Sequence, residues 1–191
     1  MYQKYQTEAL VLGSRESAEA DRTIELFTRD FGLVSGRASA IRKEKSKMRY
    51  GLTNYSFAEI SLVKGKHGWR LAGSRALRGA GGGDKNAIAA FARISELVTR
   101  LVVGEEANAN LFAVLAEAHR ALMLHDCSEW ATIELVCVAR ILYSLGYIST
   151  ESINTSLFSH TAYTGENLQE AEMMRAKLLS SINHALLETH L

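Results

Sequence analysis

Apolar and polar side chains alternate in short runs along the first 80 residues, and turn-forming residues at 30–32 and 64–68 separate some of these runs. Ile24 and Leu26 fall on one face of such a run, whereas Thr23 and Glu25 fall on the other. Strands with one apolar face suit a curled antiparallel sheet. We therefore predict a small five-stranded barrel with strands near residues 6–13, 21–29, 32–41, 56–64 and 68–75.

The pattern changes after the glycine-rich stretch 78–83, which can sustain neither a strand nor a helix. Beyond it, apolar residues recur at steps of three and four, as in amphipathic helices. We predict four helices: one capped by Asp84, one after Asn108, one from Ser128 to Gly146, and one carrying Leu178, Ile182 and Leu186.

These patterns predict an α+β chain with two domains. The β-barrel domain covers residues 1–80 and the α-helical domain covers residues 81–191. Within the second domain, residues 81–84 are expected to be a flexible linker. Residues 148–166, rich in Ser, Thr, Asn and Gly, are expected to be a connecting loop.

The charge of the chain is divided between these two halves. Residues 1–80 hold 15 Lys and Arg against 8 Asp and Glu, whereas residues 81–191 hold 7 against 13. The halves therefore carry +7 and −6, although the net charge of the whole chain is only +1. The first half is expected to prefer polyanions, and the second is not.

A run of cations begins on the third predicted strand and continues into the connection after it, and a second group lies around the next hairpin. Arg37 has the same strand parity as Ser35 and Ser39, so these three side chains should face solvent while Val34, Ala38 and Ala40 face the core. We expect the cations to bind phosphates: Arg37, Arg42, Lys43, Lys45, Lys47, Arg49, Lys64, Lys66 and Arg70.

Solubilising charges on an exposed loop would produce the same run, but the charge imbalance across the whole domain favours a nucleic-acid surface. Tyr50, Tyr55, Phe57 and Trp69 lie near the cations in sequence and are candidates for stacking on unpaired bases. Taken one at a time, each of these aromatic residues fits the barrel core better than a stacking role.

The sequence gives little evidence of a catalytic site or a metal site. The stretch 79–83 lacks the Gly-Lys-Ser/Thr ending of a phosphate-binding loop. Cys127 and Cys137 match no redox or zinc spacing, and the histidines match no zinc spacing. No carboxylate cluster of a nuclease is visible either, so we expect a protein that is not an enzyme and has no cofactor or metal.

Several segments, taken in order and spacing, resemble the RecO family of DNA repair proteins. In the first domain they are residues 8–12, 20–24, 26–33, 36–38, 41–43, 45–46 and 52–56. Past the linker they are residues 94–97, 110–112 and 145–147. The resemblance covers about three quarters of the chain and both domains. It differs in two respects. Residues 148–165 contain no cysteine where RecO proteins often carry a four-cysteine zinc module, and Asn54 and Ser149 stand where family prolines are expected.

The resemblance implies an oligonucleotide/oligosaccharide-binding (OB) fold followed by a helical domain. It also implies a mediator of DNA repair and homologous recombination that binds single- and double-stranded DNA and anneals complementary strands. Its implied partners are RecR, RecA indirectly, and the C-terminal tail of the single-stranded DNA-binding protein. That acidic tail, which ends in an aromatic residue, docks on the helical domain in the family, and Arg140 is the candidate cation for it.

The alternative is a protein-interaction adaptor in which the barrel is only a scaffold and the acidic helical half supplies the activity. Neither a signal peptide nor an apolar run long enough to cross a membrane is visible. We therefore expect a cytoplasmic protein that is associated with the nucleoid.

Overall fold

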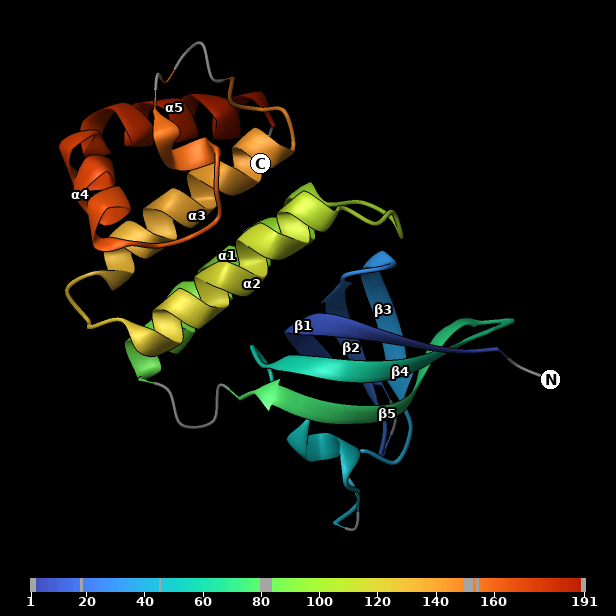
Figure 1. The fold of residues 1–191 in the computed structure, drawn as a ribbon. Coiled ribbons are helices and arrows are strands. Elements are labelled where there is room, and N and C mark those ends of the chain that lie inside the picture. Colours follow the sequence, from blue (N-terminus) through green and yellow to red (C-terminus); the bar gives the residue numbers. More distant parts are fainter. Residues whose placement is uncertain are drawn as a thin grey trace. The chain divides into compact units, whose positions relative to one another are not determined.

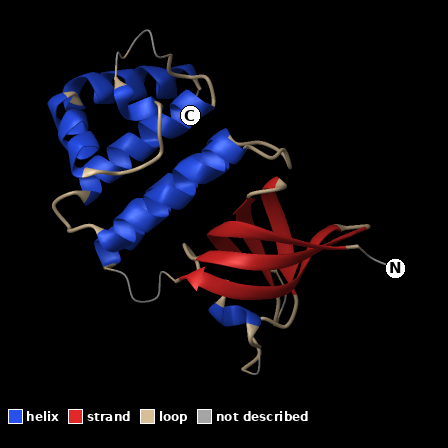
Figure 2. Cartoon of the chain, viewed as in Figure 1, coloured by secondary structure: helices blue, strands red, loops and turns tan. Residues whose placement is uncertain are grey.

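The structure, a computed structural model, describes residues 3–17, 19–44, 46–79, 84–149, 153 and 155–189. Strands come first in the chain and helices follow, as Figures 1 and 2 show. Two compact units result: Met1–Gly83 with Val102–Ala109, and Asp84–Leu101 with Asn110–Leu191. The predicted α+β class is confirmed.

The first unit is a closed barrel with the strand order β1-β2-β3-β5-β4, which is the OB-fold topology. Its strands are β1 (Lys4–Glu16), β2 (Arg22–Thr28), β3 (Gly32–Ala38), β4 (Phe57–Gly65) and β5 (Gly68–Arg78). Neighbouring strands pair antiparallel except β3 and β5, which close the barrel in parallel. In that parallel pair Arg37 lies opposite Arg70.

The barrel core follows from the alternation of side chains along the strands. Ile24, Leu26 and Val34 are fully buried and belong to one apolar cluster, whereas Arg37 on β3 is exposed. Removing such side chains from water is the main source of stability, at about 25 cal/mol for each Å² of apolar surface. The predicted inward and outward faces of β3 are therefore confirmed as far as Ala38.

The third strand ends three residues earlier than predicted. Ala40 has a positive φ of 54°, which breaks the extended conformation, and it is half-buried rather than inside the core. The carboxylate of Asp21 accepts a hydrogen bond of 2.7 Å from the Ala40 backbone nitrogen and thereby holds this conformation. A side chain from a neighbouring connection thus overrides the apolar pattern of residues 38–41.

The turn between β2 and β3 requires glycine at position 32. Gly32 has a φ of +62°, and a Cβ atom there would lie 2.1 Å from the carbonyl oxygen of Glu106. The segment Val102–Ala109 therefore packs closely on the barrel and belongs to the first unit, although the sequence pattern groups it with the helices. Lys64 Nζ also bonds Glu105 Oε2 at 2.8 Å.

The second unit contains α1 (Lys85–Leu101), α2 (Ala109–Leu124), α3 (Trp130–Ser144), α4 (Gly165–Met173) and α5 (Arg175–Glu188). The Asp84 carboxylate accepts a hydrogen bond from the Asn86 backbone nitrogen and caps α1, as predicted. Gly146, with a φ of +83°, follows the end of α3. Four of the helices occupy the predicted places.

Helix α4 is the element that the sequence pattern missed. It buries only Leu168 and Ala171, too few apolar residues to establish a helical period. The Thr164 side chain accepts a hydrogen bond from the Asn167 backbone nitrogen and starts the helix. The predicted loop 148–166 also contains a 3₁₀ turn at Ser156–Phe158, and its residues 150–152 and 154 lie outside the described part of the chain.

Within the described residues, no helix combines the length and the apolar character that crossing a bilayer requires.

Candidate nucleic-acid interface

A first cavity, of about 410 Å³, lies where the β4–β5 hairpin meets β3. Arg37 reaches it from β3, Lys66 from the hairpin and Arg70 from β5. The parallel pairing of β3 with β5 explains why Arg37 and Arg70 come together although 33 positions separate them in the sequence. In OB folds, the loop between the fourth and fifth strands is a usual part of the oligonucleotide-binding face.

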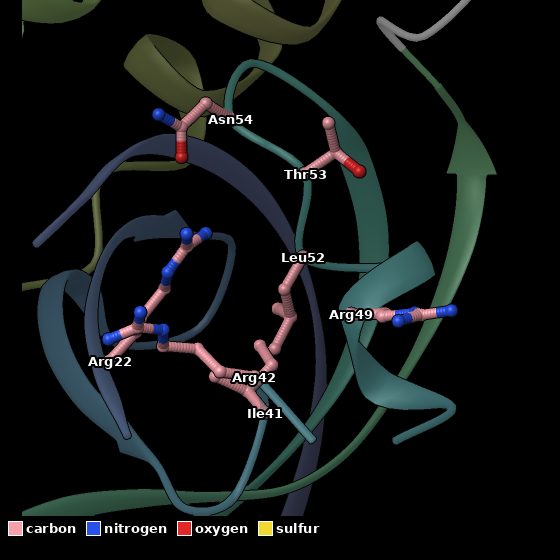
Figure 3. A pocket seen from close by; sticks show the side chains of 7 residues that line it. All are labelled: Arg22, Ile41, Arg42, Arg49, Leu52, Thr53 and Asn54. Carbon is pink, nitrogen blue, oxygen red and sulfur yellow. The ribbon is translucent and has the colours of Figure 1, made fainter. Parts of the chain in front are cut away.

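A second cavity, of about 500 Å³, opens beside the connection between β3 and β4 (Figure 3). Its lining consists of three arginines, two apolar and two polar residues: Arg22, Arg42, Arg49, Ile41, Leu52, Thr53 and Asn54. Arg42 and Arg49 were predicted to bind phosphate. Arg22 and Asn54 were not, because nothing in the linear pattern joins the start of β2 to residue 54.

Three of the predicted cations form ion pairs inside the first unit. Arg37 bonds Asp21 at 2.7 Å, Arg42 bonds Glu16 at 3.0 Å, and Lys64 bonds Glu105 at 2.8 Å. Each cation remains substantially exposed, and such surface pairs contribute only about 0–1 kcal/mol. A phosphate group can therefore replace the carboxylate partner at low cost.

Four further predicted cations are exposed and make no ion pair within the described part of the chain: Lys43, Lys47, Lys66 and Arg70. Lys45 lies outside the described residues. Exposed cations without carboxylate partners are available to counter-charges in solution. Arg49 differs, because its guanidinium donates to the Tyr50 hydroxyl at 2.6 Å and covers the Tyr50 ring at 4.7 Å from the centroid.

Asp21 and Glu105, which pair with Arg37 and Lys64, are shifted toward the charged form. The pKa of Asp21 is lowered from 3.8 by the hydrogen bond from the Ala40 backbone, and next by the bond from Arg37. The pKa of Glu105 is lowered from 4.5, first by its bond with Lys64. At neutral pH both carboxylates therefore remain charged and hold their partners.

The four candidate aromatic residues have different environments. Tyr50 is 67% exposed and follows Arg49, which lines the second cavity. Trp69 is buried and packs edge-on against Tyr5, with ring centroids 5.7 Å apart. Phe57 is also buried, and Tyr55 is half-buried with a positive φ of 64°. Tyr50 is therefore the candidate that presents its ring to solvent.

Arg140 lies inside the second unit, with only 2% of its surface exposed. Its guanidinium donates to the carbonyl oxygens of Leu157 at 2.8 Å, Thr161 at 2.8 Å and Ala162 at 3.1 Å. It also covers the Tyr163 ring at 4.7 Å. A cavity of about 270 Å³ adjoins it, with lining residues that include Val114, Tyr143, Phe158 and His160.

The two cysteines have different environments. Burial raises the pKa of the Cys137 thiol to about 12, so this thiol stays protonated at neutral pH. Cys127 is exposed. The described residues contain no group of three His, Cys, Asp or Glu side chains with metal-binding geometry.

Residues 1–76 match the sequence profile of the family described as "Recombination protein O N terminal". The DNA repair protein RecO of Desulfitobacterium hafniense (strain Y51) is 44% identical over 62 residues, 32% of this chain and 23% of that relative. RecO of Dehalococcoides mccartyi (strain ATCC BAA-2266 / KCTC 15142 / 195) is 26% identical over 170 residues.

The second of these alignments covers 78% of this chain and 66% of the relative. The DNA repair protein RecO of Gloeothece citriformis is 27% identical over 124 residues, which are 64% of this chain and 44% of the relative. The chain thus spans less than two thirds of the length of these relatives. The closed five-stranded barrel and the match over residues 1–76 agree, so this part of the chain is similar to the N-terminal domain of RecO proteins.

Proposed function

We propose that this chain is a DNA-binding mediator of repair and homologous recombination that makes and breaks no covalent bond. The observation that carries the proposal is the cluster of exposed cations around two cavities of the OB barrel. The similarity to RecO proteins, which are named DNA repair proteins, gives this cationic surface its biological context.

DNA binding would use phosphate contacts that carry little sequence information. The proposed contacts come from β3, from the connection after it, and from the β4–β5 hairpin. They are Arg37, Arg42, Lys43, Lys45, Lys47, Arg49, Lys64, Lys66 and Arg70. Each cation that meets a phosphate releases a condensed counterion, so affinity should fall steeply as salt rises.

Binding of both single- and double-stranded DNA follows from the same chemistry, because both expose phosphates. A cationic surface also lowers the repulsion between two complementary strands, which is the physical requirement for annealing them. We extend the proposal to the family's partners. RecR and this chain would together help RecA to load on DNA.

The helical unit would supply the docking place for the acidic C-terminal tail of the single-stranded DNA-binding protein. The cavity beside Arg140 has aromatic walls, Tyr143 and Phe158, whose rings stack at 4.6 Å. Arg140 would act through the positive field that it adds to this cavity. Fluorescence anisotropy of a labelled tail peptide with the full chain tests this part, and the absence of saturable binding would remove it.

The test of DNA binding is the dependence of affinity on salt, measured with the full chain on labelled duplex and single-stranded DNA. Replacing Lys43, Lys66 and Arg70 together by Ala removes cations that have no ion pair within the described residues. For duplex DNA, the slope of log affinity against log salt should weaken by about 0.9 for each phosphate that the variant no longer neutralises.

A matched control replaces Arg29, Arg75 and Arg100 by Ala. These exposed arginines lie outside both cavities, and replacing them removes the same amount of charge as the test variant does. The control should leave the slope close to the wild-type value. If the two triple variants behave alike, the proposed surface is wrong. If the wild-type chain binds no DNA, the proposed function fails as a whole.

A further inference from the structure

The second cavity differs from a simple patch of phosphate-binding charge. We propose that it is a pocket for one unstacked nucleotide of a single strand, with the phosphate near Arg22 and Arg42 and the base on Ile41 and Leu52. This inference rests on the proposed DNA-binding function and deepens it. It assigns a role to Arg22 and Asn54, which no motif in the sequence indicates.

The cations of the pocket come from β2, which carries Arg22, and from the connection after β3, which carries Arg42. Arg22 is the first residue of β2 and lies opposite Glu16 on β1, yet Glu16 makes its ion pair with Arg42 instead. Arg22 is half-buried and has no ion pair within the described residues. In Figure 3, Arg22 and Arg42 extend toward the same side of the cavity, whereas Arg49 extends away from them.

Two guanidinium groups with a single carboxylate between them leave one positive charge uncompensated. Guanidinium groups bind phosphate oxygens through paired N–H donors, and partial burial strengthens such bonds because water competes less. A phosphate group is therefore the ligand that best completes this side of the pocket. Arg22 would be its principal contact.

Two apolar residues, Ile41 and Leu52, form part of the pocket lining beside the cations, and we call them the floor. Ile41 and Leu52 line the cavity, and the rest of their side chains belongs to the barrel core, so that each is only 3% exposed. The cavity volume of about 500 Å³ is also much larger than one phosphate group needs. A nucleobase has a flat apolar face that fits this floor and fills the space beside the cations.

The polar residues add a hydrogen-bonding edge. The Ser14 hydroxyl donates to Asn54 Oδ1 at 2.8 Å and fixes the amide. The Asn54 amide nitrogen is then a donor with no partner within the described residues. It is available to an acceptor on the base or the sugar.

The walls are held in place before any ligand binds. The Arg42 backbone nitrogen donates to the Ala20 carbonyl at 3.1 Å, which ties the connection after β3 to the connection before β2. The Leu52 nitrogen donates to the Met48 carbonyl at 3.1 Å, and the Tyr55 nitrogen donates to the Val11 carbonyl at 2.8 Å. A pocket that is already formed loses less entropy on binding.

This geometry selects single strands over duplexes. In a duplex both faces of each base are covered by its neighbours, so a base reaches the floor only if it leaves the stack. Duplex DNA would therefore use the other cations of the barrel and leave the pocket empty. Arg22 should matter for single-stranded DNA much more than for duplex DNA.

The first arm of the test is a methyl NMR titration of the full wild-type chain with thymidine monophosphate, and separately with inorganic phosphate. We expect the mononucleotide to shift the methyl resonances of Ile41 and Leu52, and inorganic phosphate to leave both in place. Unmoved methyls, or equal shifts with both probes, would overturn the pocket. This arm needs no variant and so does not depend on how a variant folds.

The second arm compares Arg22→Gln with the matched control Arg75→Gln, an exposed barrel arginine that pairs with Glu59 outside the pocket. The probes are a thymidine oligonucleotide of about 15 residues, near the upper limit for one OB fold, and a duplex of equal length. Loss of one charged hydrogen bond predicts roughly tenfold weaker binding of the oligonucleotide by Arg22→Gln.

For the duplex, Arg22→Gln should behave like Arg75→Gln. Equal weakening of both probes, or no weakening of either, would overturn the pocket while the proposed function stands. If the wild-type chain binds neither probe, the proposed function itself has failed. The three results are distinguishable in one set of titrations.

Discussion

Arg37 and Asp21 belong both to the fold and to the proposed interface. The Asp21 carboxylate accepts a hydrogen bond of 2.7 Å from the Ala40 backbone and two from the Arg37 side chain, at 2.7 and 2.9 Å. One carboxylate thus fixes the end of β3 and orients a cation toward the first cavity. The same interaction sets how the stability of the barrel responds to acid.

We predict that Asp21 makes the folded state more sensitive to acid. Because its pKa is lowered from 3.8 in the folded state, its ionised form stabilises the fold at every pH above that value. The contribution is lost as the pH falls below 3.8 and through the lower folded pKa. Thermal unfolding measured from neutral to strongly acidic pH should therefore show a shallower loss below about pH 4 for Asp21→Asn.

The control for this prediction is Asp30→Asn, because Asp30 is exposed and forms no ion pair within the described residues. It should keep the wild-type response to acid. Equal acid sensitivity in wild type and Asp21→Asn would show that the interaction with Ala40 and Arg37 does not stabilise the fold.

At the scale of single residues, strand parity was enough to predict that Arg37 faces solvent and Val34 faces the core. Parity works because successive side chains of a strand point to opposite faces. The second cavity was beyond such reasoning. It joins Arg22 to Asn54 through the curvature of the barrel, and no local pattern records that proximity.

At the scale of elements, residues 157–163, which precede α4, are organised around one buried arginine. Arg140 on α3 donates to three backbone carbonyls of residues 157–162 and covers the ring of Tyr163. These bonds satisfy backbone acceptors that lie outside any α-helix or β-strand. The segment is thereby fixed without a cluster of metal ligands among the described residues.

We predict that Arg140→Met destabilises the chain by about 3 kcal/mol or more, because it leaves three carbonyl acceptors without their charged donor. Urea unfolding of the full chain measures this loss. Hydrogen exchange should also quicken in residues 155–163 before the rest of the helical unit.

Arg93→Met is the matched control, because Arg93 makes two bonds of 2.6 Å to Glu134 but is 60% exposed. A surface pair of this kind should cost no more than about 1 kcal/mol. Similar losses in both variants would mean that burial of Arg140 does not matter.

The elements themselves could be predicted to the extent that each buries a regular stripe. Such apolar stripes occur in the five strands and in helices α1, α2, α3 and α5, and they are visible in the sequence as regularly spaced apolar residues. Helix α4 begins at a threonine cap and buries only two residues. Two buried positions are too few to show a helical repeat of apolar residues in the sequence. The end of β3 depends on Asp21, a residue that lies 19 positions before Ala40.

At the scale of the whole molecule, the charge difference between the two halves could be read from the sequence. The excess of +7 belongs to residues 1–80, where the structure forms the barrel and both of its cation-lined cavities. The proposed partner surfaces have no comparable sequence signal. Such surfaces are defined by contacts with other proteins, and we found no short sequence motif that marks them.

We propose that the barrel is the part of this chain that binds DNA. The most direct measurement is photo-crosslinking of the full chain to an oligonucleotide that carries 4-thiothymidine, followed by mass spectrometry of the crosslinked peptides. We predict crosslinks within residues 22–70, which contain the cations of both cavities. Crosslinks confined to residues 84–189 would contradict the claim, because the helical unit would then bind the DNA.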